Sequence, residues 1–286
     1  MPITDGMRSA SANVSHSLVG VAVGFLLTGL VVGGCAATDK SDSQLLTVIG
    51  AAVEATQAAG TTAIDTTYTT GASSVPITEH TAYDYRRQIG EVTSPSVGVE
   101  ILDGPTTYSP LSSDPSAGIG IPGKTWIADR LPHLGDNGLQ AFNPATVPAR
   151  LVAIIQAARK VGNETIHGVE TTRYDLTLSA AGMKEILFFN PALKVSFRPA
   201  SIWIDRDKRL RQIQVSYILP DEGLVTYTST YVAFGIPVNV SLPADSQVET
   251  LEQYEKYICV ATKSQAHPNG MGISVGAGPG SGPQSC

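Results

Sequence analysis

The sequence predicts an α+β domain in which a few helices lie over one face of an antiparallel β-sheet. Charged residues make up only 15% of the chain, below the roughly 25% of an average soluble protein. Most of the chain after residue 60 alternates apolar and polar residues with the period of a strand, and the alternating runs are separated by short turns rich in Pro, Gly and Asp. Successive strands with short connections favour an antiparallel sheet.

Two to three helices are expected. Ser41 and Gln44 resemble a capping box, and apolar residues then recur at helical spacing until Gly60. A second helix is predicted over 148–161, because Pro148 suits a first turn and one face carries Leu151, Ile154, Ile155 and Ala158. A third, weaker helix is predicted over 180–189, ended by Asn190 and Pro191.

The strands are expected in the alternating runs. In residues 172–178, Tyr174, Leu176 and Leu178 share a face. Residues 201–205 turn through 206–208 into 209–218 as a hairpin, and 224–234 form a further long strand. Shorter strands are predicted at 61–70, 77–89, 96–102 and 124–128.

The N-terminus carries an export and anchoring signal. An apolar stretch from Leu18 to Gly34 ends in Val32-Gly33-Gly34-Cys35, which resembles the bacterial lipoprotein box. That resemblance implies transfer of a diacylglyceryl group to the Cys35 thiol, cleavage just before Cys35, and a lipid anchor with acyl chains such as palmitate on the extracytoplasmic face of the cell membrane. A transmembrane helix is the alternative, although the stretch is shorter than the roughly 20 residues that a span needs; an ordinary cleaved signal is another. The predicted organisation is a signal peptide over 1–34, a lipidated cysteine and tether over 35–43, one domain over 44–262 and a Gly/Pro-rich tail over 263–286.

Charge and cysteine usage fit an exported protein. Residues 1–34 hold one Asp and one Arg, so the remaining chain keeps the net charge of −6, and nothing basic clusters. We therefore expect no nucleic-acid partner. Cys259 and Cys286 remain as an even pair in an oxidising compartment, where we expect them to form a disulfide; two free thiols are the alternative.

Two matches to catalytic motifs lack their structural context. Gly118 to Thr125 spells a phosphate-binding loop, but no buried strand precedes it and Pro132 limits any helix after it. Gly272 to Gly276 spells a nucleophile elbow, but neither an acid nor a histidine follows. The histidines are scattered singly, without the spacing of metal ligands. We therefore expect no catalytic residues, no metal, no cofactor and no enzyme activity.

Three segments carry a family resemblance. They are the helical stretch from Phe142, the G-x-E-x-x-x-G-x-x-T-x-x-Y pattern from Gly162 to Tyr174, and Ile202-Trp203-Ile204-Asp205 with its following strand. Together they resemble the actinobacterial, mycobacterial-type LppX/LprA/LprF/LprG lipoproteins, which share a half-barrel fold with LolA and RseB. The resemblance implies a strongly curved antiparallel sheet whose concave apolar face, covered by two to three helices, holds the acyl chains of a lipid or lipoglycan.

The expected function is therefore to bind and carry, or chaperone, such a lipid at the membrane. The alternative is an envelope lipoprotein that senses or binds a protein partner on the same fold, because fold alone does not fix function. The parity of the strands leaves open which sheet face lines the cavity. The candidate lining residues are Leu46, Ile49, Val53, Leu151, Ile154, Ile155, Tyr174, Leu176, Trp203, Val215, Tyr217, Tyr227 and Tyr231.

Overall fold

The structure is a computed structural model that describes residues 39–265, apart from 72, 96, 112–120, 131–142, 188–191 and 221. The predicted signal peptide, Cys35, Cys286 and the elbow-like sequence at 272–276 lie outside the described residues. Within the part that is described, no helix is long and apolar enough to cross a membrane.

The described chain forms four α-helices, thirteen strands and one short 3-10 helix. In chain order they are α1 (Asp39–Ala58), β1 (Thr61–Thr70), β2 (Ser73–Asp84), β3 (Ile89–Ser94), β4 (Gly98–Asp103), β5 (Thr106–Pro110), β6 (Trp126–Arg130), α2 (Val147–Ala153), β7 (Ile155–Ile166), β8 (Val169–Leu178), α3 (Ala180–Ile186), β9 (Ser196–Phe197), β10 (Ala200–Asp205), β11 (Leu210–Leu219), β12 (Gly223–Phe234), the 3-10 helix (Asp245–Gln247), β13 (Val248–Thr250) and α4 (Leu251–Gln265).

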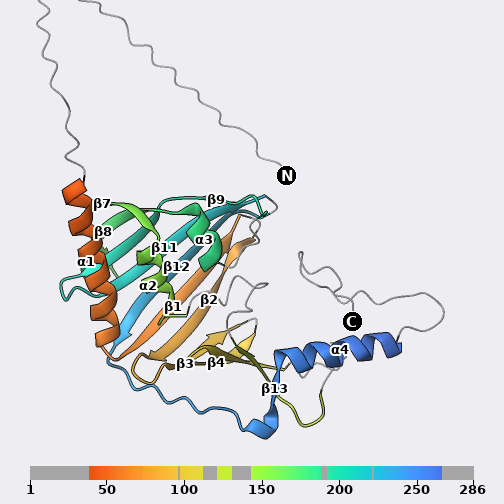
Figure 1. Ribbon diagram of the computed structural model, residues 1–286. Coiled ribbons are helices and arrows are strands. Elements are labelled where there is room, and N and C mark those ends of the chain that lie inside the picture. The colour runs from red at the N-terminus through yellow and green to blue at the C-terminus, as the bar shows by residue number, and fades with distance from the viewer. Residues whose placement is uncertain are drawn as a thin grey trace, which may run out of the picture. The chain divides into compact units, whose positions relative to one another are not determined.

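All the strands belong to one curved, unclosed sheet (Figure 1). The order across it is β13-β6-β5-β4-β3-β2-β1-β12-β11-β10-β8-β7, and β9 pairs with β11 off this path. Every pairing is antiparallel except that of β13 with β6. β7 and β13 are the two edges, so the sheet has the open form that the half-barrel expectation requires. The predicted fold class is confirmed.

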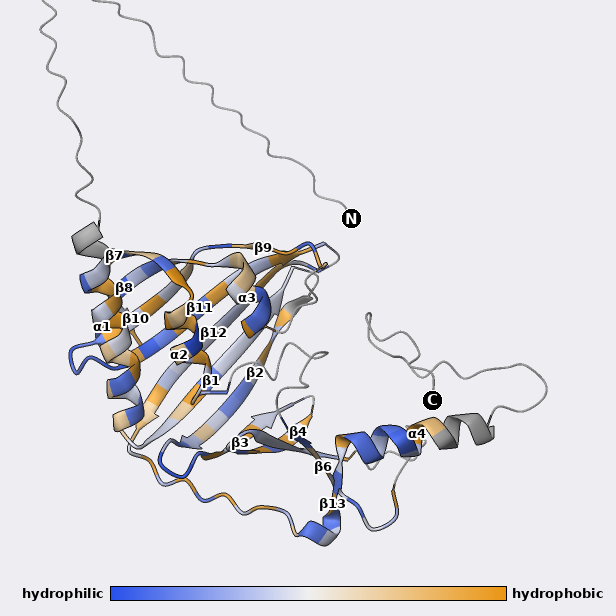
Figure 2. Cartoon of the chain, viewed as in Figure 1, coloured by the Kyte–Doolittle hydropathy of each residue, from blue (hydrophilic) through white to orange (hydrophobic). Residues whose placement is uncertain are grey.

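Helices α1, α2 and α3 lie on one face of the sheet, which we call the inner face (Figure 1). α1 contacts β7 and β11, α2 contacts α1 and α3, and α3 also contacts β9. Along the strands, hydrophobic and hydrophilic residues alternate (Figure 2), because successive side chains point to opposite faces. α4 packs elsewhere, against β6 and β13.

The second helix is shorter than predicted. α2 ends at Ala153, and residues 155–166 form the strand β7 instead of continuing the helix to Val161. β7 pairs with β8 along its whole length. A continued helix would leave the backbone groups of β8 without this partner, so tertiary pairing overrides a helical spacing that was correct only for the first two turns.

Other boundaries also differ from the sequence prediction. The single strand expected at 77–89 is divided into β2 and β3 by a turn in which Gln88 has φ 54°. α3 ends at Ile186, before the predicted end at 189. β5, β9, β13 and α4 were not expected, and α4 extends to Gln265, past the expected domain boundary at 262. Thr250 and Gln253 form the start of α4 as a capping pair, since Gln253 N donates to Thr250 Oγ1 at 3.2 Å.

Candidate functional site

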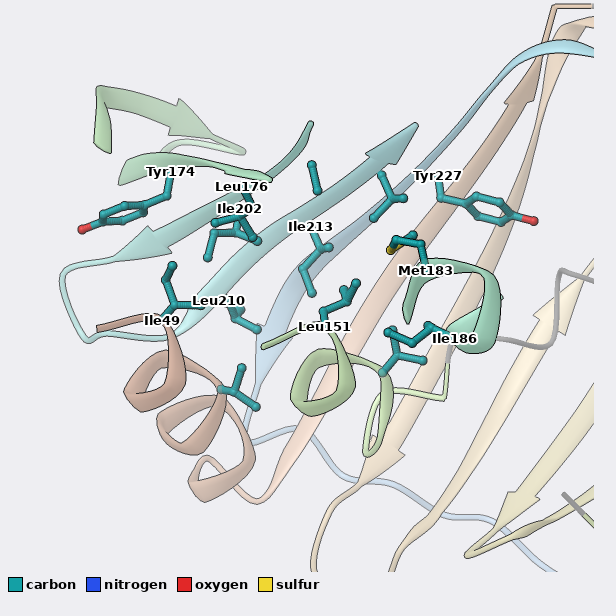
Figure 3. Packing of buried hydrophobic residues seen from close by; sticks show 14 of the residues in the cluster. Ile49, Leu151, Tyr174, Leu176, Met183, Ile186, Ile202, Leu210, Ile213 and Tyr227 are labelled. Carbon is teal, nitrogen blue, oxygen red and sulfur yellow. The ribbon is translucent and has the colours of Figure 1, made fainter. Parts of the chain in front are cut away.

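A continuous apolar cluster lies between the inner face and helices α1–α3 (Figure 3). We call it the inner-face cluster. Its buried members are Ile49, Ala52 and Val53 of α1, Ile64 of β1, Val147 and Leu151 of α2, Ala158 of β7, Tyr174 and Leu176 of β8, Met183, Ile186 and Leu187 at α3, Ala200, Ile202 and Ile204 of β10, Leu210, Ile213, Val215 and Tyr217 of β11, and Val225, Tyr227 and Tyr231 of β12.

Local periodicity explains how this cluster forms. In β10 every second residue, Ala200, Ile202 and Ile204, faces inward, and in α1 the residues Ile49 and Val53 lie one helical turn apart. Complete burial of one such side chain stabilises the fold by about 1.5–3 kcal/mol. The cluster is therefore the main source of stability for this half of the sheet.

Aromatic rings line one end of the cluster. Tyr68 and Tyr227 have ring centroids 4.8 Å apart, Tyr227 and Tyr217 are 6.1 Å apart, and Tyr217 and Phe197 are also 6.1 Å apart. The Tyr68 hydroxyl donates to Glu222 Oε2 at 3.2 Å, and burial together with this carboxylate raises the pKa of Tyr68 to about 12. Burial also raises the pKa of Tyr227 far above its usual range. These hydroxyls stay neutral donors at physiological pH.

The inner face becomes polar beyond β12. Thr66 and Ser229 share a hydrogen bond of 3.1 Å, and Glu79 lies opposite Thr66 in the next strand. Burial raises the pKa of Glu79, against a hydrogen bond from Ser94 that lowers it. On β4, the buried Glu100 accepts a hydrogen bond of 2.6 Å from Ser109. The inner face thus offers apolar surface under the helices and hydroxyl and carboxyl groups beside it.

A small pocket lies at the boundary between these two regions. α2 contributes Val147 and Pro148, and the sheet contributes residues that include Ile64, Thr81 and Tyr231. The pocket encloses about 20 Å³, which is room for about one water molecule. An acyl chain needs more space than this pocket provides, so α2 would have to move for a lipid to bind here.

The opposite, outer face carries a network of charges. Trp203 lies opposite Arg173 of β8, and its Nε1 donates to Glu164 Oε2 at 2.7 Å. Asp175 accepts hydrogen bonds from Ser201 and Arg173, each at 2.9 Å. Burial alone would raise the pKa of Asp175, but these donors and the nearby guanidinium charges lower it below its usual value.

The structure places most of the candidate lining residues at the inner face. The residues that the structure brings together in the inner-face cluster are Ile49, Val53, Leu151, Tyr174, Leu176, Val215, Tyr217, Tyr227 and Tyr231. Ile154 and Ile155 pack against the cluster, although from the end of α2 and the start of β7 rather than from a helical face. Trp203 is a correction, because the period of β10 turns it to the outer face. Leu46 is also a correction, since Leu45 and Leu46 are both partly buried but it is the neighbouring Leu45 that packs against the cluster.

Sequence reasoning missed several residues of the cluster. α3 contributes Met183 and Ile186, whose spacing of three residues was a usable helical signal. Ile202 and Ile213 lie at the centre of the sheet under the helices, and their alternation with polar neighbours indicated an inward face once one member was placed. Cys35 and Cys286 lie outside the described residues, so lipidation and the disulfide with Cys259 stay predictions.

The segment that resembles a phosphate-binding loop lacks the required helix. Lys124 donates through Nζ to the carbonyl of Val248 at 2.6 Å, and Trp126 then begins the strand β6. A helix N-terminus is needed at that position to bind phosphate. Among the described residues, no group of three or more His, Cys, Asp or Glu side chains is arranged to hold a metal ion.

Comparisons with known proteins give matches in structure only. No family model matches the chain, and no curated protein matches it by sequence. The Mycobacterium tuberculosis lipoprotein LppX matches with a TM-score of 0.49 and 18% identity, over 70% of this chain and 100% of LppX. LprF from Mycobacterium bovis matches with a TM-score of 0.42 and 15% identity, over 71% of this chain and 98% of LprF.

The Pseudomonas aeruginosa MucA/MucB complex matches less well. Its TM-score is 0.35 at 11% identity, and the match covers 70% of this chain and 59% of that one. The fold class stated above therefore rests on the strand pairing of this chain itself. The solved structures that are similar to it include a mycobacterial lipoprotein.

Proposed function

We propose that this chain is a lipoprotein of the cell envelope, anchored through Cys35 on the extracytoplasmic face of the membrane. In this proposal it binds the acyl chains of a lipid or lipoglycan between the inner face and helices α1–α3, and it carries or chaperones that lipid. It acts as a binding protein and not as an enzyme.

The observation that carries the proposal is the construction of the inner-face cluster. A broad apolar sheet face is covered in part by α2 and α3, which have seven residues each. Helices this short have little stability of their own and depend on packing. An acyl chain can replace that packing, because each buried CH₂ group contributes about 0.8 kcal/mol.

The polar groups beside the cluster suit a headgroup. Hydroxyls of Thr66, Ser229 and Ser109 and carboxyls of Glu79 and Glu100 lie on the same side of the sheet as the apolar cluster. A ligand with apolar chains and a hydroxyl-bearing head would match this division. Ligand sites commonly combine an apolar lining with a few convergent polar groups.

One observation favours the alternative, an envelope lipoprotein that binds a protein partner without carrying lipid. The inner-face cluster is close-packed where it is described, with Ala52 and Val225 at 0% exposure. A filled core of this kind needs no ligand for its stability.

The two functions are separated by lipid extraction and native mass spectrometry of the mature protein from its own membranes. Val215→Trp places a large side chain in the inner-face cluster, where Val215 is 1% exposed, and Val232→Trp is the matched control at an exposed position on β12. We expect acyl lipid to co-purify with the natural protein and with Val232→Trp, but not with a folded Val215→Trp variant.

Thermal unfolding of each variant keeps the test decisive. If Val215→Trp does not fold, Thr66→Trp at the small pocket is the second inner position. Absence of acyl lipid from the natural protein would overturn the proposal. Unfolding of both inner variants would also overturn it, because the face would then be an ordinary close-packed core.

A further inference from the structure

Three segments of the chain meet at one end of the sheet. Ser196 of β9 lies opposite Ile218, and Ile218 lies opposite Leu224 across the β11–β12 hairpin. Val225 in turn lies opposite Thr70 at the end of β1. A Cβ at Gly71 would lie 3.2 Å from the backbone of the β11–β12 turn, so the two hairpin tips touch. We call the described residues among 70–76 and 218–224, together with 193–198, the hairpin rim; residues 72 and 221 are not part of it.

The hairpin rim exposes apolar side chains together with basic ones. Val75 is 69% exposed, Leu224 50% and Leu193 37%. Lys194 and Arg198 are exposed on the segment that contains β9, and Glu222, which accepts a hydrogen bond from the Tyr68 hydroxyl, is exposed on the β11–β12 turn. Single exposed apolar residues need no explanation, but a group of them beside basic residues is typical of a surface that meets lipid.

The hairpin rim is continuous with the inner-face cluster. Phe197 lies in the rim and contacts Tyr217, and Tyr217 stacks with the buried Tyr227. Tyr68 continues this line of rings on β1. An apolar path therefore leads from the rim to the face that we propose binds acyl chains.

The start of α1 lies at the same end of the sheet. Near the end of α1, Thr56 Oγ1 accepts from Leu210 N at 2.8 Å, at the beginning of β11, whereas β11 ends in the hairpin rim. A helix rises about 1.5 Å per residue, so the first turn of α1 lies roughly 25 Å from Thr56. In Figure 1 the first turn of α1 and β9 both lie along the upper edge of the sheet.

The predicted anchor is close to this first turn. Cys35 precedes Asp39, where α1 begins, by four residues. Four extended residues span at most about 14 Å. A lipid on Cys35 would therefore hold this end of the domain, and not the opposite end, near the bilayer.

We propose that the hairpin rim docks onto the surface of the bilayer in which the protein is anchored. Its apolar side chains reach the boundary with the acyl chains, and Lys194 and Arg198 face anionic headgroups. This inference rests on the proposed function and deepens it, since it names the end of the domain at which acyl chains pass between the bilayer and the inner face. Each basic residue near an anionic surface is expected to raise the docked population about fivefold.

The test compares two tryptophan variants of the lipidated full-length mature protein in vesicles. Leu224→Trp is in the hairpin rim, and Val232→Trp is its control on the same strand and the same side, eight residues or about 26 Å away. The vesicles contain phosphatidylcholine and phosphatidylglycerol with brominated acyl chains, which quench nearby tryptophan. The unsubstituted protein supplies the baseline for its two natural tryptophans.

We expect bromine to quench the added tryptophan at Leu224 at least about threefold more than the one at Val232. Exchange of both Lys194 and Arg198 for Gln should reduce quenching at Leu224 in vesicles with phosphatidylglycerol, but not in vesicles of phosphatidylcholine alone. If Leu224→Trp does not fold, Val75→Trp is the second rim position.

Equal quenching at the two positions would overturn the inference. So would protection of the Leu224 tryptophan from acrylamide without quenching by bromine, because a protein partner would then cover the rim. Acyl lipid is extracted from the same samples. An unquenched rim with bound lipid overturns only the docking, and a quenched rim without bound lipid overturns only the proposed function.

Discussion

The hydroxyl group of Thr56 connects α1 to the sheet by a hydrogen bond. Thr56 is 1% exposed, and its Oγ1 donates to the carbonyl of Ala52 and accepts from the backbone N–H of Leu210, both at 2.8 Å. Leu210 is the first residue of β11, and its N–H lies in a buried environment. Without this acceptor it would lose its partner where water cannot replace it.

We expect Thr56→Val to lower the free energy of unfolding by about 1–3 kcal/mol, because it keeps the shape and removes the acceptor. Urea denaturation measures the effect. Thr47→Val is the control, since Thr47 makes the same bond to the residue four positions earlier, Ser43, but is exposed. The control should change stability by less than about 0.5 kcal/mol; equal effects of the two substitutions would refute the role of the Leu210 bond.

Asp175 predicts a dependence of stability on pH. Its pKa is lowered in the folded protein by Ser201 and by the guanidinium groups, which outweigh its burial. A lowered pKa stabilises the fold above the unfolded value of about 3.9. That contribution is lost as the pH falls through the lower, folded pKa.

Asp175→Asn should therefore reduce the free energy of unfolding by about 1–3 kcal/mol at pH 7. Its difference from the natural protein should shrink below about pH 4. Urea denaturation between pH 7 and pH 2 measures this, with Glu185→Gln as an exposed control. A difference that is constant over this range would contradict the prediction.

At the scale of elements, α2 and α3 meet at a glycine. A Cβ on Gly182 of α3 would lie 2.5 Å from Cγ2 and 2.9 Å from Cβ of Ile154 at the end of α2. Both atoms are close to the backbone and cannot move away easily. Ala is normally preferred to Gly inside a helix by about 1 kcal/mol, so packing and propensity oppose each other here.

We expect packing to decide, and Gly182→Ala to destabilise the fold by about 1–3 kcal/mol. Ile154→Ala removes Cγ2, so the double variant should be more stable than the sum of the two single effects predicts. A double-mutant cycle in urea measures this coupling. Additive effects would show that α2 and α3 do not press on each other at this point.

Helix α2 also shows how much of the fold the sequence could predict. Pro148 and Leu151 marked the start and the buried face of α2 correctly, because the preference of proline for a first turn and the helical spacing are local signals. The end of α2 depends on the distant β8, which pairs with β7 and takes the residues from Ile155 onward out of the helix. No local pattern contains that information, and an error of this kind is expected wherever a short helix leads into a strand.

The candidate site was predictable to a similar degree. Leu176, Val215 and Tyr227 could be predicted because they alternate clearly with polar residues in the sequence, and the structure places them in the inner-face cluster. Trp203 alternates with Ile202 and Ile204, and only the pairing with Arg173 shows that it faces outward. α4 could have been found from the capping pair of Thr250 and Gln253, which are three residues apart.

At the scale of the whole molecule, we predict that Cys35 carries the lipid anchor. Cys35→Ala should abolish lipidation and processing, because no other thiol follows the apolar stretch directly. Labelling of cells with a palmitate analogue and detergent phase separation measure the two effects. Recovery of the variant as a processed, acylated protein would contradict the anchor, and Cys259→Ala is the control that should still be lipidated.

A further prediction at this scale concerns a disulfide between the two C-terminal cysteines. We expect Cys259 of α4 to be joined to Cys286, since export would place the remaining pair in an oxidising compartment that favours a disulfide. Thiol titration of the unreduced protein under denaturing conditions should find no free thiol at either position. Two reactive thiols, located by peptide mapping at 259 and 286, would refute the pairing.

The open form of the sheet creates a risk of self-assembly. β7 is an edge of twelve residues, and no described strand pairs with its outer side. Such an edge is a template on which a second copy could add its own β7 and start a fibre. The register of β7 shifts between Ile155 and Ala157 and again between Lys160 and Gly162, and Arg159 and Lys160 are exposed between these bulges. The irregular, charged edge disfavours stacking of copies, so the domain can keep an unclosed sheet without becoming a seed for aggregation.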